Sequence, residues 1–286
     1  MLSRTHQTIG HAVSYSGVGI HSGHSTSFTC HPAPIGTGIR FRRADIDGAP
    51  EIPATTQALR GIACATTLGQ RHTAIHTVEH VLSAISALGI SNLLIEVNGS
   101  EIPASDGSAA EFVDLLLSGE IRTQPQAVSA YRMRRSLTVR DHDRIVHVEP
   151  YNGLKITYSI DFQNALIGQQ TRTFDGGYEQ YIGDIAPART FCLAEQLPQL
   201  QKLGLSQGGS LHNAVVFAHD KILNESLRFP DEPVRHKILD ALGDLALLGR
   251  PLLGHITIQK GSHKVHTDFV KALHSHPDYW EEILLE

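Results

Sequence analysis

Residues 234–245 read VRHKILDALGDL and place ligand-type side chains on one face of a predicted helix. His236 and Asp240 are four residues apart, so both side chains stack on that face and can hold one cation. Asp244 follows one turn later and can act from just outside this pair. We interpret Gly243 as leaving the face open to a ligand, at a cost of about 1 kcal/mol in helix propensity.

Residues 76–80 read HTVEH and form the second segment with possible chemistry. His80 can supply an imidazole ligand while the Glu79 carboxylate reaches a water on the metal and acts as its general base. His80, His236 and Asp240 together give two nitrogens and one oxygen, a set typical of catalytic zinc sites with one free position. The same ligands also suit Fe²⁺.

Two other functions fit parts of this pattern. With His76 and His80 as ligands, residues 76–80 match the H-x-x-E-H pattern of inverted zinc proteases, but His236 and Asp240 would then have no role. Alternatively, the 18 histidines belong to a non-catalytic zinc-binding protein, which has no need for Glu79 beside a ligand. Both alternatives stay open at this point.

Periodicity predicts the elements that position these residues. In the first half, alternation indicates strands near residues 26–30 and 39–41, followed by a helix at 77–88, a strand at 92–97 and a helix at 108–118. Residues 120–130 contain no apolar period and are predicted to be a linker. The second half begins again with strands at 136–140, 144–148 and 154–162, then strand 213–217, helix 233–248, strand 255–259 and a final helix.

Each half therefore runs from strands to a helix that carries histidine. This order predicts an α+β fold of two similar domains, each a β-sheet layered with helices, packed face to face. We expect residues 1–125 to form the first domain, with Glu79 and His80, and residues 126–286 to form the second, with His236 and Asp240.

Composition restricts the class of protein. With 24 Lys and Arg against 29 Asp and Glu, the net charge of −5 argues against a nucleic-acid binder. No apolar run reaches the roughly 20 residues that span a bilayer, and the N-terminus has no apolar core typical of a signal peptide. Three dispersed cysteines form no disulfide framework. We expect a cytoplasmic protein.

The order of several motifs resembles one enzyme family. The sequence is similar to the zinc-dependent UDP-3-O-acyl-N-acetylglucosamine deacetylases of lipid A biosynthesis, in motifs spread over nearly the whole chain: GVGIH at 17–21, TVEH at 77–80, EIP at 101–103 with DGS at 106–108, ARTF at 188–191, GGS at 208–210 and VRHKILD at 234–240. The resemblance implies two α+β domains with the active site between them, and an insert in the second domain that shapes a passage for the acyl chain.

The resemblance also implies roles for individual residues. Its zinc ligands fall on His80, His236 and Asp240, and its general base falls on Glu79. Its remaining functional positions fall on the catalytic histidine His263, its orienting carboxylate Asp244, the hydroxyl Thr190 beside the reacting carbonyl, Lys237 near the substrate phosphates, and the nucleotide-contacting pair Asp161 and Phe162.

The implied reaction is hydrolysis of the 2-acetamido group of a UDP-linked acylated sugar, giving a free amine and acetate. We expect the enzyme to be a monomer. His263 is the expected proton donor to the leaving amine, with Glu79 as the rival route. The sequence around His263, KGSHKVH, departs from the family pattern, so the nearby His266 competes for the same assignment.

Overall fold

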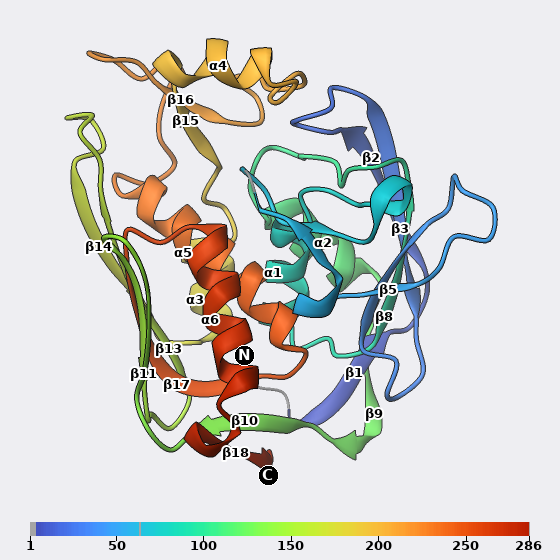
Figure 1. Ribbon diagram of the computed structural model, residues 1–286. Helices are drawn as coiled ribbons and strands as arrows, with labels where there is room; N and C mark the ends of the chain where they lie inside the picture. The colour runs from blue at the N-terminus through green and yellow to red at the C-terminus, as the bar shows by residue number, and fades with distance from the viewer. Residues whose placement is uncertain (1–3, 63, 286) are drawn as a thin grey trace.

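The computed structural model describes residues 4–62 and 64–285. Two sheets form the outer sides of the molecule, and helices α1 (Glu79–Ala87) and α5 (Glu232–Leu245) pack against each other between them (Figure 1). The mixed architecture confirms the predicted α+β fold. The boundary near residue 125 stays a prediction.

The first sheet contains five strands in the order β2-β3-β8-β4-β5. Along β3, Thr26, Phe28 and Cys30 point into the core, as the alternation predicts. Phe28 meets Phe112 of α2 (Ala110–Ser118) with ring centroids 5.8 Å apart, which attaches that helix to the sheet. The five strands are β2 (Val13–Val18), β3 (Ser25–Pro32), β4 (Ile39–Arg43), β5 (Ile52–Pro53) and β8 (Leu93–Asn98).

The second sheet has seven strands around a central β17, which pairs with β12, β13 and β10. Helix α6 (His263–Ser275) packs against α5 and against strands of this sheet. The strands are β10 (Ser129–Met133), β11 (Leu137–Asp141), β12 (Arg144–Glu149), β13 (Leu154–Asp161), β14 (Gln169–Phe174), β17 (Leu252–Gln259) and β18 (Trp280–Leu284).

One predicted connection has a different structure. Residues 120–130 were expected to form a linker, but Ile121–Ala127 form strand β9, which pairs antiparallel with β1 (Thr5–Ile9). This two-stranded ribbon is mostly exposed or half-buried along β9, so its sequence carries no alternation of buried apolar residues. The linker prediction is therefore wrong.

Short elements complete the fold. Between α3 and α5, β15 and β16 pair in parallel and flank α4 at one end of the molecule (Figure 1). These short elements are β6 (Leu59–Gly61), β7 (Thr67–Leu68), α3 (Tyr178–Gln180), the π-turn Tyr181–Ile185, β15 (Phe191–Leu193), α4 (Leu197–Lys202), β16 (Val215–Phe217), and 3₁₀ turns at Thr56–Ala58, Arg71–Thr73, Ala194–Gln196, Ala246–Leu248 and Pro277–Tyr279. Among the described residues, no helix has the length and apolar character needed to cross a membrane.

Candidate metal centre and active site

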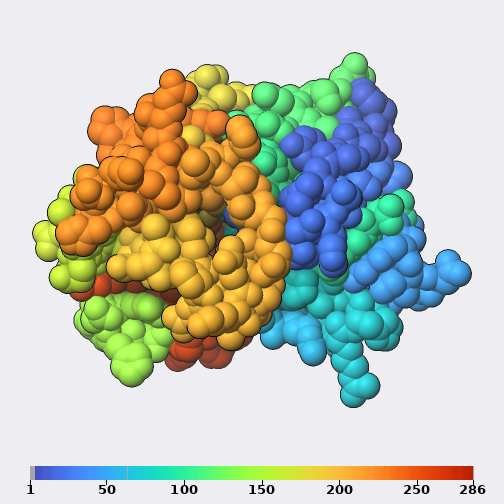
Figure 2. Space-filling view, turned by 90° about the horizontal axis from the view of Figure 1, so that it is seen from above, coloured from blue at the N-terminus to red at the C-terminus, as the bar shows by residue number. Residues whose placement is uncertain are grey.

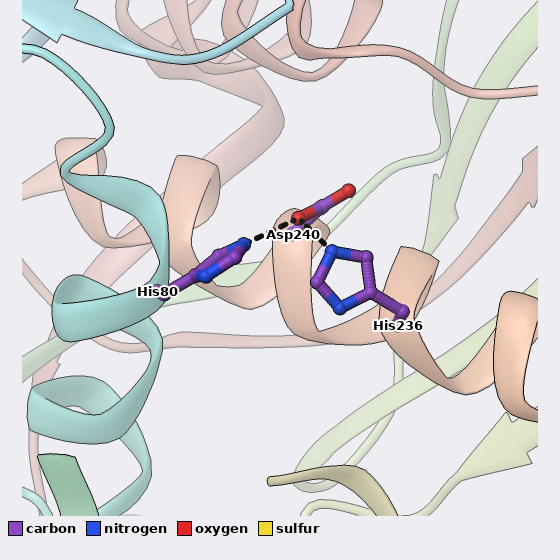
Figure 3. Close-up of side chains that lie close together, drawn as sticks. All are labelled: His80, His236 and Asp240. Carbon is purple, nitrogen blue, oxygen red and sulfur yellow. Dashed lines mark ion pairs between the residues drawn. The ribbon is translucent and has the colours of Figure 1, made fainter. Parts of the chain in front are cut away.

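Three buried side chains from α1 and α5 converge on one point (Figure 3). The Asp240 Oδ1 atom lies 3.2 Å from His236 Nε2 and 3.6 Å from His80 Nε2. The two imidazole rings stand nearly perpendicular, with centroids 4.9 Å apart. Their ligand atoms all lie within 4.8 Å of one another, so the three residues can hold a single ion.

The chemistry of this group fits a divalent metal such as zinc. The His236 Nδ1 atom lies 3.0 Å from the Ala188 carbonyl oxygen, which directs Nε2 toward the other two ligands. Burial alone would raise the pKa of Asp240, but His236 and Lys237 hold it well below its usual value. The carboxylate therefore stays ionised, as a metal ligand must.

Close contact between the two helices makes this convergence possible. A methyl group added at Gly243 of α5 would overlap the backbone carbonyl of Glu79 in α1. The interpretation of Gly243 as an opening for a ligand is therefore wrong, because the Glu79 backbone fills that space. Glycine at this position instead allows the two ligand-bearing helices to cross at short distance.

A second group of polar side chains lies beside the three candidate metal ligands. His263 Nε2 is 3.9 Å from Glu79 Oε1, and His263 Nδ1 is 2.8 Å from Asp244 Oδ2. Burial alone would lower the pKa of His263, but the charge and hydrogen bond of Asp244 raise it to about 10. Burial raises the pKa of Glu79. The site therefore combines a cationic imidazole with a carboxyl group that readily accepts a proton.

Thr66, which no sequence pattern indicates, connects these two groups. Its backbone N–H donates to Glu79 Oε2 at 3.0 Å, and its hydroxyl donates to Asp244 Oδ1 at 2.5 Å. Thr66 lies in a connection between two short strands, where no periodicity predicts its neighbours. Its contacts with residues 13 and 178 positions away depend wholly on the tertiary fold.

The start of α1 is fixed by a buried carboxylate. Glu101, only 1% exposed, accepts hydrogen bonds from the backbone of His21 and Ser22 and from the Thr77 hydroxyl. Thr77 has a φ of 60°, in the left-handed region that costs a branched residue energy. Glu101 therefore stabilises the strained turn that aims Glu79 and His80 at the site.

The chain is similar to known proteins along nearly its whole length. The chain matches the model of the family described as UDP-3-O-acyl N-acetylglycosamine deacetylase over residues 6–275. The chain belongs to this deacetylase family. It is similar to three proteins named UDP-3-O-acyl-N-acetylglucosamine deacetylase. It is 39% identical over 280 residues to that of Myxococcus xanthus, covering 98% of this chain and 89% of the relative.

The other two relatives come from different bacteria. The chain is 38% identical over 278 residues to the protein of Acidithiobacillus ferrooxidans, covering 96% of this chain and 91% of the relative. It is 39% identical over 283 residues to the protein of Thioalkalivibrio sulfidiphilus, covering 98% of this chain and 93% of the relative. The resemblance to the deacetylase family that the motifs indicate is thus confirmed over nearly the whole chain.

The remaining predicted residues of this family member lie at different distances from the candidate metal centre formed by His80, His236 and Asp240. Lys237 Nζ bonds Asp240 Oδ2 at 2.7 Å and lies 5.6 Å from the centre of the Phe191 ring. Thr190 precedes Phe191, whose ring centroid is 6.5 Å from that of His236. Lys237 therefore borders the group formed by His80, His236 and Asp240, whereas Thr190 is linked to it only through Phe191, its neighbour in the chain.

The pair predicted to contact the nucleotide lies further out. The Phe162 and Phe191 rings have centroids 5.5 Å apart, so Phe162 reaches the metal group through one intervening ring. Asp161 forms an ion pair with Lys260 at 3.1 Å. No contact joins Asp161 to a metal ligand among the interactions of the described residues.

The protease alternative does not fit this geometry. His76 precedes α1, which begins at Glu79, and the turn at Thr77 separates them, so His76 and His80 do not share a helix face. His76 Nδ1 bonds the Thr67 hydroxyl at 2.9 Å. Among residues 4–62 and 64–285, the possible metal-binding groups do not include His76.

Seen from above, the segment around α4 lies against N-terminal residues of the first half (Figure 2). The backbone N–H groups of Gln207 and Gly208 donate to the carbonyl oxygens of His21 and Ile20, at 3.1 Å each. The segment that follows α4 is thereby tied to the loop that Glu101 holds. Three leucines of this region are partly exposed: Leu203, Leu211 and Leu223.

Proposed function

We propose that this chain hydrolyses the 2-acetamido group of a UDP-3-O-acyl-N-acetylglucosamine to a free amine and acetate, a step of lipid A biosynthesis. The observation that carries the proposal is the convergence of His80, His236 and Asp240 in a chain that belongs to the deacetylase family. Glu79 and His263 beside that group supply what amide hydrolysis needs in addition, which is one proton acceptor and one proton donor.

The proposed metal is Zn²⁺, and Fe²⁺ suits the same ligands. His80, His236 and Asp240 would hold the ion. These three buried side chains offer two nitrogens, one oxygen and no sulfur, which is typical of a catalytic rather than a structural zinc site. When bound, such an ion supplies Lewis acidity and makes a water molecule acidic enough to attack near neutral pH.

Glu79 is the proposed general base. Its carboxylate accepts a proton from the attacking water, while Thr66 N–H holds the other carboxylate oxygen in place at 3.0 Å. The Thr190 hydroxyl donates to the carbonyl oxygen as negative charge develops there. One such donor typically contributes about 2.7–4 kcal/mol to transition-state stabilisation.

His263 is the proposed proton donor to the leaving nitrogen. Its Nδ1–H is engaged by Asp244, so the Nε2–H remains for the substrate on the side that faces Glu79. The C–N bond breaks as this proton reaches the amine, and the neutral imidazole regains a proton afterwards. A pKa of about 10 keeps His263 protonated near neutral pH, which favours it over the Glu79 route.

Substrate binding is assigned to residues around this centre. Lys237 carries positive charge for the diphosphate, and Asp161 and Phe162 contact the nucleotide. The partly exposed leucines of the insert, Leu203 and Leu211, support a passage for the acyl chain, since each buried CH₂ contributes about 0.8 kcal/mol. We further propose a cytoplasmic monomer made of two domains, residues 1–125 and 126–286.

One assay tests the proposal directly. Purified protein is incubated with UDP-3-O-acyl-N-acetylglucosamine, and release of acetate is measured with and without a chelator. We expect acetate release that the chelator abolishes and added Zn²⁺ restores. UDP-N-acetylglucosamine without the acyl chain serves as the matched substrate and should react poorly. No acetate from the acylated substrate with zinc-loaded protein would contradict the function.

A further inference from the structure

Asp244 accepts hydrogen bonds from two histidines, of which the mechanism uses one. Its Oδ2 atom lies 2.8 Å from His263 Nδ1 and 2.9 Å from His266 Nδ1. Its Oδ1 atom accepts from the Thr66 hydroxyl. Asp244 is completely buried, and His263 and His266 together offset the cost of burial and lower its pKa to about 2.

The two histidines differ in access to the active site. The His263 side chain is 11% exposed and faces Glu79, whereas His266 is 1% exposed and its far nitrogen, Nε2, lies 3.1 Å from the Tyr158 hydroxyl. His266 therefore contacts buried groups at both ring nitrogens and has no free nitrogen for a substrate. This separates the two candidates that the sequence leaves in competition.

The partners of His266 define its protonation. Burial lowers its pKa, an effect that Asp244 opposes only in part, so the ring is neutral near neutral pH. Because Asp244 is a carboxylate, His266 must donate to it from Nδ1, which leaves Nε2 as an acceptor. The Tyr158 hydroxyl, whose pKa burial raises well above 10, keeps its proton and donates it to Nε2.

The backbone next to α6 is shaped around this contact. A methyl group added at Gly261 would overlap both the Tyr158 hydroxyl and His266 Nε2. Ser262 follows and caps α6, with its side chain accepting from the Val265 N–H. Glycine at position 261 thus leaves room for the two side chains to meet directly beneath the turn that presents His263.

We infer that His266 is a positioning residue, anchored at Nε2 by the Tyr158 hydroxyl so that its Nδ1–H holds the Asp244 carboxylate in reach of His263. The inference rests on the proposed function, because His263 matters only if it acts on a substrate. A carboxylate with one donor at Oδ1 and only His263 at Oδ2 can rotate, and the His263 ring then loses its fixed direction.

Steady-state kinetics test the role. In His266→Leu the donor to Asp244 is lost, and we expect kcat to fall about 10- to 100-fold with KM little changed, as when other groups that orient active-site histidines are removed. In His266→Asn the amide NH₂ takes the place of Nδ1–H, and most of the activity should return. Metal content should equal that of wild type in both variants.

A variant of the same helix controls for a merely structural effect. Val270 is completely buried on α6 without a polar contact in the network, so Val270→Ala should lower stability but leave kcat per metal-loaded chain unchanged. If His266→Leu behaves like Val270→Ala, or if His266→Asn is as impaired as His266→Leu, the inference is wrong.

The tautomer provides a readout that does not depend on turnover. In zinc-loaded protein labelled with ¹⁵N-histidine, the His266 ring should give the NMR pattern of a neutral imidazole protonated at Nδ1. Tyr158→Phe removes the hydrogen bond to Nε2 but not the one at Nδ1, so the Nε2 signal should shift toward that of an acceptor nitrogen without a hydrogen bond, and kcat should fall. A cationic or Nε2-protonated His266 in the wild type would overturn the inference.

The outcomes separate the two proposals. If wild-type protein releases no acetate but shows the Nδ1-protonated ring, the deacetylase function fails while the hydrogen-bond chain stands. If wild-type protein is active and His266→Leu retains its kcat, the function stands and the positioning role is overturned.

Discussion

Gly243 of α5 lies directly against the backbone of Glu79 in α1, with no space for a side chain between them. Helix α1 carries His80, and α5 carries His236 and Asp240, the other two candidate metal ligands. The contact at Gly243 therefore sets the distance between His80 and this pair. A local feature of backbone packing thus determines whether three residues far apart in the sequence can share one ion.

Gly243→Ala should therefore disturb both stability and metal binding. Alanine normally favours a helix, but here its methyl group must displace the Glu79 backbone, and overpacking typically costs about 1–3 kcal/mol. We expect a lower free energy of unfolding in urea and weaker zinc binding. Gly183→Ala is the matched control, because no atom lies within 4 Å of an added methyl group there. Equal stability in the two variants would contradict this account of the helix contact.

Replacement of a predicted metal ligand should remove the metal. In His236→Ala or Asp240→Ala we expect the zinc content, measured by elemental analysis after gel filtration, to fall from about one ion per chain to near zero. His212→Ala removes an exposed histidine of the insert and should retain the ion. A full complement of zinc in both ligand variants would exclude this group as the metal site.

Glu79→Gln should separate metal binding from catalysis. The amide preserves the size of the side chain but does not accept the proton of the attacking water, so turnover should fall by about 10²–10⁴-fold while zinc is retained. Acetate release and metal content are measured on the same preparation. Near-normal turnover would end the assignment of Glu79 as general base.

How far the sequence predicts the site depends on how local each relationship is. The spacing of His236 and Asp240 is a property of one helix, and periodicity correctly predicts that helix, which the structure shows as Glu232–Leu245. The pairing of this helix with residues 79 and 80 depends on tertiary packing, and only the resemblance to the deacetylase family indicates it from the sequence.

The features that the sequence misses are non-local. Thr66 contacts Glu79 and Asp244 through a loop without periodicity, so no pattern marks it. Strand β9 is stabilised by hydrogen bonds to β1, more than 100 residues earlier, rather than by a buried apolar face. Within its own helix Gly243 suggests an opening for a ligand, whereas its role is to make room for the backbone of another helix.

The His263–Asp244 pair predicts a dependence of stability on pH. The pKa of His263 rises from 6.5 to about 10 on folding, so the folded chain keeps a proton that the unfolded chain releases above pH 6.5. The contribution of the His263–Asp244 pair to the free energy of unfolding is therefore fully present below pH 6.5 and is lost as the pH rises toward 10. The slope reaches about 1.4 kcal/mol per pH unit for one proton.

His263→Gln isolates this contribution, since glutamine offers a donor to Asp244 but does not titrate. We expect the free energy of unfolding of metal-free wild type, from urea titrations at about pH 7 and about pH 9, to fall more steeply with pH than that of the variant. Identical pH dependence in the two proteins would show that His263 does not hold an additional proton in the folded state.

Lys237 lies where it can either bind the diphosphate of the substrate or support the Asp240 carboxylate, and a substitution separates these two roles. Its amine bonds Asp240 Oδ2, while Oδ1 faces the two histidines, so the lysine leaves one carboxylate oxygen for the metal. Lys237→Met should raise KM for the UDP-linked substrate about 10- to 100-fold, as expected when a charged hydrogen bond of about 1.5–3 kcal/mol is lost, and the difference should shrink at high salt. Lys271→Met, on the outer face of α6, is the control and should leave KM unchanged. If Lys237→Met instead loses zinc at unchanged KM, the lysine supports the Asp240 ligand and does not bind the diphosphate.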